Sequence, residues 1–333
     1  MGLASSAQFL EMLDAAQAAG YAYPAVNVTS SETLNAALRG LAEAGSDGIV
    51  QMTPSGAAFA SGGALGDAAA GARALAEFAH VLAERYPVLM GLHTDHCPPG
   101  RVDDFLRPLL AETAARRERG EPPLFNSHMF DGSSLPLSEN LALARLLLEE
   151  ASRLGIVLEL EIGVVGGEED GVDASSQPFE RLYTTAEDGL AVAELLGTGE
   201  RGRYLLAATF GNVHGRYAPG RVTLRPALLG ELQEALAAHF AGASFQFVFH
   251  GGSGAPPAAI AEAVSHGVVK MNLDTELQHV FTSAVAEHVA IADLAEKSAF
   301  DPRSWGRKAE AAMAARVALA CEELGSAGRS LAR

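Results

Sequence analysis

Several residue types are scarce, and each scarcity excludes a class of protein. Only Cys97 and Cys321 are cysteines, so the chain offers neither a disulfide framework nor zinc-finger spacing, and a reducing cytoplasmic location is expected. Basic residues number 24 against 41 acidic ones, and the net charge of −17 argues against nucleic acid and anionic membrane as partners. No apolar run reaches the length of a membrane span, and the first residues do not resemble a signal peptide.

What the sequence does contain is a regular alternation of strand-like and helix-like segments. Hydrophobic residues make up 48% of the chain and charged residues 20%, which is typical of a globular protein. Short β-prone runs are predicted at 21–28, 47–53, 87–94, 124–131, 156–163, 203–210, 245–250 and 267–273. Stretches of helical period are predicted at 31–44, 68–85, 103–117, 137–154, 185–196, 226–240, 256–265 and 274–292, with Ser31 and Ser138 as expected N-caps.

Eight strand–helix units of this size predict an α/β fold, a TIM (β/α)₈ barrel. A doubly wound open sheet is the structural alternative. No linker divides the chain, so residues 1–333 are expected to form a single domain. Residues 300–333 are expected to be a C-terminal loop and helix outside the barrel.

Polar residues end nearly every predicted strand. An unpaired buried polar group costs about 1–3 kcal/mol, so such residues are expected to share one site. In TIM barrels that site lies at the carboxyl ends of the strands. The residues concerned are Asn27, Thr53, His93, Asp95, His96, Asn126, His128, Asp131, Glu159, Glu161, Asn212, His214, His250, Asn272 and Asp274.

Three of the histidines, His96, His214 and His250, follow the third, sixth and seventh predicted strands. Each alone is more often a core histidine, but three imidazoles converging with an open fourth position are typical of a catalytic zinc site. We interpret His93 and His128 as partners that orient ligands or carboxylates.

The carboxylates divide into two groups. Asp95 precedes the ligand candidate His96, and a carboxylate there can transfer a proton at a metal-bound substrate oxygen. Glu159 and Glu161 share a strand face at a spacing of two residues. The acidic residues within 163–171 are either a solvated turn or a mobile loop that brings a base over the substrate.

A glycine-rich segment, 251–254, lies between the seventh strand and a helix. Glycines there let backbone N–H groups approach a phosphate, and a helix N-terminus favours its negative charge. Phosphate sites in TIM barrels typically follow strands seven and eight, and residues 272–275 follow strand eight.

Eight ordered motifs covering nearly the whole chain resemble the class II fructose-bisphosphate aldolases, specifically the class IIA branch. They are LHTDHC (92–97), SHMFD (127–131), LELEIG (158–163), GGEEDGV (166–172), FGNVHG (210–215), FHGGSG (249–254), KMNLDT (270–275) and DPR (301–303). The resemblance implies a lyase that reversibly cleaves fructose 1,6-bisphosphate into dihydroxyacetone phosphate and glyceraldehyde 3-phosphate in glycolysis and gluconeogenesis.

The resemblance also implies the roles of individual residues. Catalytic Zn²⁺ is held by His96, His214 and His250, with Glu161 as a mobile carboxylate that, together with Asp131, offers a second divalent site. Asp95 handles the proton on the aldehyde-derived oxygen, and Glu169 removes the proton alpha to the dihydroxyacetone phosphate carbonyl. Substrate contacts are implied for Asn27, Thr53, Gly215, Gly251, Gly252, Ser253, Asn272, Leu273, Asp274, Thr275 and, from a neighbouring subunit, Arg303.

A monovalent cation, Na⁺ or K⁺, near the phosphate and a homodimer or homotetramer are also implied. The sequence departs from the family at Thr53, where a Ser is usual, and has a short segment between His288 and Phe300. The alternatives are an aldolase for tagatose 1,6-bisphosphate or another phosphorylated ketose, a Schiff-base aldolase using Lys270, a metal-dependent hydrolase, and a non-catalytic sugar-phosphate binder. The sequence leaves open the exact ketose, the physiological metal, the occupancy of a second metal site, the choice of dimer or tetramer and the kinetic constants.

Overall fold

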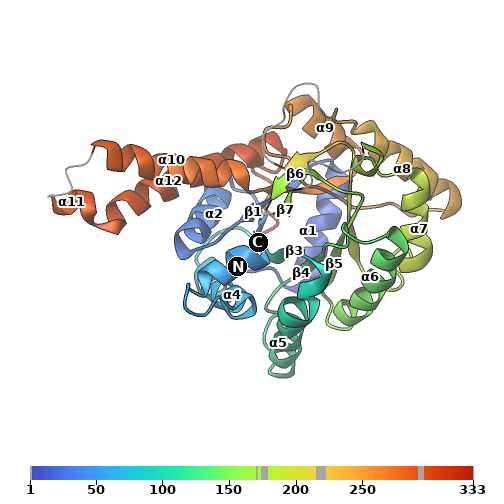
Figure 1. Ribbon diagram of the computed structural model, residues 1–333, viewed down its shortest axis with the longest axis horizontal. Helices are drawn as coiled ribbons and strands as arrows, with labels where there is room; N and C mark the ends of the chain where they lie inside the picture. The colour runs from blue at the N-terminus through green and yellow to red at the C-terminus, as the bar shows by residue number, and fades with distance from the viewer. Residues whose placement is uncertain (1, 170–171, 174–178, 215–222, 292–295, 333) are drawn as a thin grey trace.

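The computed structural model describes residues 2–169, 172–173, 179–214, 223–291 and 296–332 (Figure 1). Eight parallel strands close into a barrel in the order β1-β11-β10-β8-β5-β4-β3-β2. Each falls within or overlaps one of the eight predicted strands, so the predicted (β/α)₈ barrel is confirmed. Their bounds are β1 Tyr23–Asn27, β2 Gly48–Met52, β3 Met90–Cys97, β4 Ser127–Phe130, β5 Val157–Ile162, β8 Tyr204–Ala208, β10 Phe247–Phe249 and β11 Val268–Leu273.

Helices surround the barrel and cover the apolar outer faces of its strands. Their bounds are α2 Ser31–Ala44, α3 Pro54–Ala60, α4 Ala68–Ala83, α5 Arg107–Glu118, α6 Leu137–Ser152, α7 Ala186–Leu196, α8 Ala227–His239 and α9 Pro257–Ser265. Shorter helical turns are η1 Pro99–Arg101, η2 Val102–Leu106 and η3 Phe179–Leu182. The predicted caps were wrong, because Ser30 caps α2 through Thr33 and α6 begins after Pro136 without a side-chain cap.

An additional helix, α1 (Ser6–Ala19), begins at a capping box formed by Ser5 and Gln8. Its buried face packs into a core cluster with inward-facing residues from the amino-terminal parts of the strands. This helix was not predicted, although Phe9, Met12, Leu13 and Ala16 recur at helical spacing.

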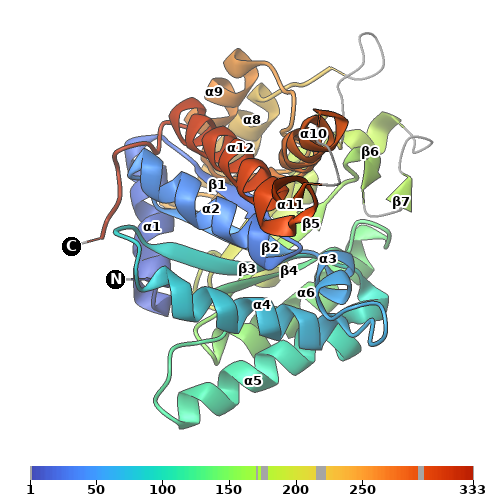
Figure 2. The same cartoon turned by 90° about the vertical axis from the view of Figure 1, so that its left-hand side faces the viewer.

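The C-terminal helices form an arm that projects from the barrel (Figure 1). It consists of α10 (Thr275–Ile291), α11 (Lys297–Phe300) and α12 (Pro302–Glu323). In Figure 2, α12 lies along α2, and the two helices approach closely at Gly40. A Cβ atom at Gly40 would lie 2.5 Å from the carbonyl oxygen of Ala314, so only glycine allows this packing.

A small second sheet lies outside the barrel, in the order β7-β6-β9. Strand β6 (Gly166–Glu169) pairs antiparallel with β7 (Val172–Asp173) and parallel with β9 (Val213–His214). The glycine-rich acidic segment, which we interpreted as either a solvated turn or a loop, is therefore partly a β-hairpin. Of the helices within the described ranges, none combines the length and apolarity that a membrane crossing requires.

Candidate active site

The carboxyl-terminal part of β3 supplies two consecutive site residues, Asp95 and His96. Consecutive residues of a regular strand point to opposite faces, so one of the two would normally face away. Here the pairing of β3 with β4 is irregular between Thr94 and Cys97, and His96 has a φ of +43°. A bulge of this kind re-aims a side chain, and left-handed backbone outside glycine costs about 1–3 kcal/mol. Such strain is typical of functional positions.

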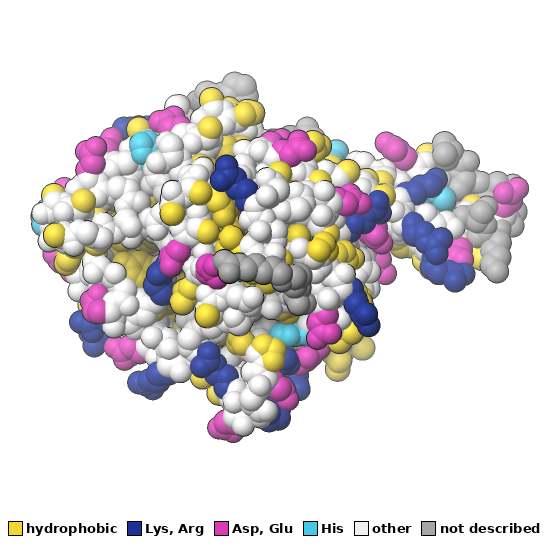
Figure 3. All heavy atoms as spheres, turned by 180° about the vertical axis from the view of Figure 1, so that it is seen from behind, with side chains coloured by type: hydrophobic (Ala, Val, Ile, Leu, Met, Phe, Trp, Pro, Cys, Tyr) yellow, Lys and Arg dark blue, Asp and Glu magenta, His cyan; other side chains and the backbone are white. Residues whose placement is uncertain are grey.

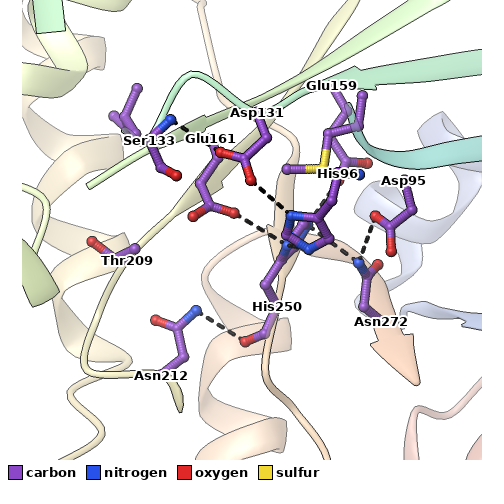
Figure 4. Close-up of polar contacts among 12 residues, drawn as sticks. Asp95, His96, Asp131, Ser133, Glu159, Glu161, Thr209, Asn212, His250 and Asn272 are labelled. Atoms are coloured by element: carbon purple, nitrogen blue, oxygen red, sulfur yellow. Dashed lines mark hydrogen bonds and ion pairs between the residues drawn. The ribbon is translucent and has the colours of Figure 1, made fainter. Parts of the chain in front are cut away.

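His96 and His250 face each other across the mouth of the barrel (Figure 4). His96 Nε2 lies 3.1 Å from His250 Nδ1, and Glu161 Oε2 lies 3.3 Å from the same His250 nitrogen. The other nitrogen of His96, Nδ1, lies 3.0 Å from Asp131 Oδ2. Among the described residues, three groups of side chains could hold a metal ion: Asp95, His96 and His250; His93, Asp95 and Glu159; and His96, Asp131 and Glu161.

The spacing of these atoms fits a tetrahedral metal ion. Nitrogens bound to zinc at 2.0–2.1 Å in tetrahedral geometry lie about 3.3 Å apart, close to the separations at His250 Nδ1. Glu161 Oε2 is buried, and among the described residues it makes no hydrogen bond of regular geometry, although it lies 3.3 Å from His250 Nδ1. A buried carboxylate oxygen without such a hydrogen bond needs a cation or another partner, so the residues present fit a divalent ion.

Charges around His250 are strongly coupled. Burial alone would lower its pKa, but the neighbouring carboxylates of Glu159 and Glu161 raise the pKa of His250 to about 9 in the metal-free protein. Burial alone would raise the pKa of Glu159, but the charge of Lys270 holds it well below its usual range. Burial and Lys270 together lower the pKa of His93 to about 3, so His93 is neutral. It lies 3.5 Å from Glu159, as expected of an orienting partner.

Asp95 is fully buried and is held by three side-chain amides from three other strands. Asn27 and Gln51 donate to Oδ2 at 3.0 and 2.9 Å, and Asn272 donates to Oδ1 at 3.0 Å. This amide cradle fixes the carboxylate beside His96 and His250. Gln51 was not among the predicted site residues, although a glutamine inside the apolar strand Gly48–Met52 is a signal, because buried amides need partners.

The structure describes three other predicted residues only in part or not at all. The backbones of His214 and Glu169 lie in β9 and β6, and Glu169 lies two residues beyond Gly167, the register partner of His214. Their side chains and the whole of Gly215 lie outside the described residues. Asn212, two residues before His214, donates to the carbonyl oxygen of His250 at 2.9 Å and so links this segment to the cluster.

The predicted phosphate-binding segments adjoin the cluster formed by His96, His250 and Glu161. Gly251, with a φ of +64°, would place a Cβ atom 2.5 Å from the Val213 carbonyl oxygen, and a Cβ at Gly252 would lie 2.3 Å from Met271. Gly251 therefore requires glycine, whereas a side chain at position 252 would displace Met271. Ser253 follows them before α9, and Leu273 to Thr275 form the junction of β11 and α10. Two helix N-termini thus begin close after these segments.

Thr53 and Arg303 have local partners. The Thr53 hydroxyl caps α3 by accepting from the Gly56 N–H at 3.1 Å. Arg303 is 73% exposed at the start of α12 and pairs with Asp301 at 2.6 Å, on the arm that extends from the barrel. His128 Nδ1 contacts the Thr94 hydroxyl at 2.7 Å and its ring packs near Phe125, and its orienting role stays a prediction.

A closed parallel barrel with carboxylates, imidazoles and amides gathered at the carboxyl ends of its strands has the architecture of a (β/α)₈-barrel enzyme. The family model of the class II fructose-bisphosphate aldolases matches residues 7–329. The chain therefore belongs to the class II fructose-bisphosphate aldolase family, as the motifs predicted.

Individual relatives align with this chain over almost their full length. The chain is 55% identical to a fructose-bisphosphate aldolase of Streptomyces galbus, an alignment that covers 99% of this chain and 100% of the relative. It is 51% identical to the fructose-bisphosphate aldolase of Mycobacterium tuberculosis strain H37Rv, covering 99% of each. The crystal structure of fructose-bisphosphate aldolase from Campylobacter jejuni superposes with a TM-score of 0.86 at 36% identity, covering 99% of this chain and 97% of that one. The prediction of a lyase of the aldolase type is confirmed at the level of the family.

Proposed function

We propose that the chain reversibly cleaves fructose 1,6-bisphosphate into dihydroxyacetone phosphate and glyceraldehyde 3-phosphate with the help of zinc. The proposal rests on one observation: a group of metal-ligand atoms and a positioned carboxylate lie side by side at one mouth of the barrel. Ligand-type atoms of His96, His250 and Glu161 stand at metal-sharing distances, and the buried Asp95 carboxylate lies beside them in its amide cradle. Membership of the aldolase family supports this reading.

The residues that would hold zinc are His96, His214 and His250, with Glu161 as the adjacent carboxylate. When bound, the ion supplies a positive charge that polarises the substrate ketone and stabilises negative charge on its oxygen. Asp131 and Glu161 together with His96 would accommodate a second divalent ion. Imidazole nitrogens and few carboxylates suit zinc better than magnesium or calcium.

The chain's own carboxylates move the protons. In the cleavage direction Asp95 accepts the proton of the C4 hydroxyl, the C3–C4 bond breaks, and the aldehyde half leaves. The bonding electron pair stays on the dihydroxyacetone phosphate half, and Glu169 donates a proton to C3. Asn27, Gln51 and Asn272 keep the Asp95 carboxylate in position for its step.

Substrate phosphate would bind between the two loops that follow β10 and β11. Backbone N–H groups at Gly215 and from Gly251 to Ser253 would face one side of it, and Asn272 to Thr275 the other. The N-termini of α9 and α10 favour the negative charge there, and a monovalent cation, Na⁺ or K⁺, held by backbone carbonyls would add to it. Asn27 and Thr53 would contact the sugar.

Arg303 would bind the second phosphate from a neighbouring subunit. Its exposure and its place on the projecting arm support this role, since the arm carries Arg303 away from the mouth of its own barrel. Lys and Arg side chains gather on that arm in an otherwise acidic protein, and Arg303, Arg307 and Lys308 are exposed there (Figure 3). The proposal therefore includes a homodimer or homotetramer working in the cytoplasm.

Tagatose 1,6-bisphosphate or another phosphorylated ketose is the alternative substrate, because only the aldehyde half would differ. The relatives named above are fructose-bisphosphate aldolases, which favours the fructose compound. Lys270 is fully buried and ion-paired with Glu159, which supports metal catalysis over a Schiff base. A retro-aldol assay coupled to triose phosphate reduction, run on both bisphosphates, tests the proposal. No cleavage of either bisphosphate by zinc-loaded protein would refute it.

A further inference from the structure

Lys270 and Glu159 form an ion pair inside the barrel that the proposed chemistry leaves without a task. Both side chains are fully buried. Lys270 Nζ lies 2.8 Å from Glu159 Oε2 and donates to Oε1 at 3.1 Å, and it also donates to Asn272 Oδ1 at 2.7 Å. The ammonium group thus contacts two side chains. One of them, Glu159, contacts the metal-ligand candidate His250, and the other, Asn272, contacts Asp95.

The first direction runs through Glu159 to His250. His250 Nε2 lies 2.8 Å from Glu159 Oε1, and an ionised carboxylate only accepts, so the hydrogen belongs on Nε2. Asn272 Nδ2 lies 3.4 Å from the same nitrogen, but this longer contact is between two donors and cannot reverse the assignment. With its hydrogen on Nε2, His250 presents the Nδ1 lone pair to the space shared by His96 Nε2 and Glu161 Oε2.

The second direction runs through Asn272 to Asp95. Because Lys270 donates to Asn272 Oδ1, the amide oxygen is fixed on the lysine side and the amide nitrogen must face away from it. That nitrogen donates to Asp95 Oδ1 at 3.0 Å. A flipped amide would bring its NH₂ group to the ammonium and its oxygen to the carboxylate, and both contacts would be repulsive.

From these contacts we propose that Lys270 is a positioning residue that orients the metal ligand His250 through Glu159 and the proton-transfer group Asp95 through Asn272. The inference rests on the proposed function in assigning those two roles. Replacing a buried ion pair by uncharged groups of similar volume is often neutral or stabilising. The pair is therefore not needed for stability alone, whereas both groups it orients belong to the site.

Two variants test the metal side. Glu159→Gln weakens the fixed acceptor of His250, and Glu159→Gln/Lys270→Met removes both charges without leaving either one buried and unpaired. We expect both to raise the dissociation constant for zinc about 10–100-fold, as loss of a partner of a metal-bound histidine does. Zinc affinity is measured on the full chain by competition with a chromophoric chelator. The chain offers a matched control in Thr94→Val, which removes the hydroxyl partner of another fully buried histidine, His128.

Thr94→Val should keep zinc affinity within about threefold of the parent, since His128 has no contact with the cluster among the described residues. Parental zinc affinity in both test variants would overturn the proposal. An equal loss in the control would also overturn it, because it would reduce the effect to general destabilisation of the barrel. If the parental chain itself binds no zinc, the proposed function fails first, and the titration distinguishes this outcome from the others.

The Asp95 side is tested by comparing two reactions of the double variant at saturating zinc. Bisphosphate cleavage needs Asp95, whereas exchange of the alpha proton of dihydroxyacetone phosphate does not. We expect kcat for cleavage to fall at least about tenfold while exchange falls much less, because small displacements of a proton-transfer group are costly. Equal losses in both reactions, or parental kcat for cleavage, would overturn the link from Lys270 to Asp95.

Discussion

The two ends of the barrel differ in whether their buried polar groups have hydrogen-bond partners. At the amino-terminal end, the fully buried Asp47 accepts from the Leu89 N–H at 2.7 Å, the Leu331 N–H at 2.7 Å and the Ser330 hydroxyl at 2.5 Å. At the same end, ahead of β8, Arg203 joins Asp14 and Gln246. At this end the carboxylates and amides have their hydrogen bonds within the protein, and they tie the C-terminal tail and α1 to the barrel.

At the carboxyl-terminal end, buried polar atoms are left without hydrogen-bond partners. Among the described residues these include Glu161 Oε2, His93 Nε2 and Gln51 Oε1. A non-glycine residue with left-handed backbone, His96, also lies here. Groups that are unsatisfied or strained in the resting fold lower stability, but they are available to bind a ligand. The contrast predicts that substitutions at the carboxyl-terminal end change activity, whereas those at the amino-terminal end change stability.

Metal removal should have the largest effect of all. We expect EDTA to abolish aldol cleavage and zinc or a similar divalent ion to restore it, because the ligand-type atoms at the carboxyl-terminal end match a metal site. Circular dichroism of the metal-free protein should show an intact barrel. Borohydride with substrate should leave Lys270 unlabelled. Full activity in a demonstrably metal-free preparation would refute the metal assignment.

The two catalytic carboxylates should give the next largest losses, about 10²–10⁴-fold for a positioned acid or base. Asp95→Ala should stop bisphosphate cleavage yet largely spare exchange of the alpha proton on dihydroxyacetone phosphate. Glu169→Ala should suppress that exchange directly. Both rates are measured on the same preparations, and exchange at the parental rate in Glu169→Ala would show that this glutamate is misassigned.

Arg303→Ala should have a smaller effect that depends on the substrate. A guanidinium that binds a phosphate far from the breaking bond contributes to selection of the doubly phosphorylated sugar. We expect a large loss in kcat/KM for fructose 1,6-bisphosphate and a much smaller one for fructose 1-phosphate. Equal losses on both substrates would indicate a structural role on the arm.

A mixing experiment tests whether Arg303 acts between subunits. Arg303→Ala and Asp95→Ala proteins, mixed under conditions of subunit exchange, should regenerate activity, because a mixed dimer pairs one intact Asp95 with the partner's intact Arg303. A labelled subunit confirms that exchange has occurred. No recovery after confirmed exchange would place Arg303 in the site of its own chain.

Asp47→Asn should leave the chemistry intact and affect stability. The amide cannot accept from all three donors, and hydrogen bonds to charged groups contribute about 1.5–3 kcal/mol each. We expect the free energy of unfolding to fall by roughly that amount, with kcat unchanged in the folded enzyme. Asp14→Asn is the matched control at the same end, where an exposed ion pair contributes at most about 1 kcal/mol. A loss of kcat without loss of stability in Asp47→Asn would contradict the prediction that substitutions at the amino-terminal end change stability.

The barrel strands were predictable because each is a short, largely apolar run of three to eight residues closed by polar or turn residues, a local property. Helix α1 was missed although its apolar spacing is regular, because it precedes the first strand and lies outside the repeat. The pairing of β6 with β9 was missed because the two strands lie some forty residues apart in the chain, and such pairing leaves no local signal.

By itself the sequence determined the eightfold strand–helix alternation, the family, and the identity of most chemical groups, since periodicity and motifs are properties of the chain. The tertiary structure alone decided how those groups meet. It placed Gln51 against Asp95, turned His96 through an irregular strand pairing, and joined Lys270 to both Glu159 and Asn272. Apart from the contact between Lys270 and Asn272, which lie two residues apart, these contacts join residues far apart in the chain. They depend on strand register and on barrel closure, which no local pattern encodes.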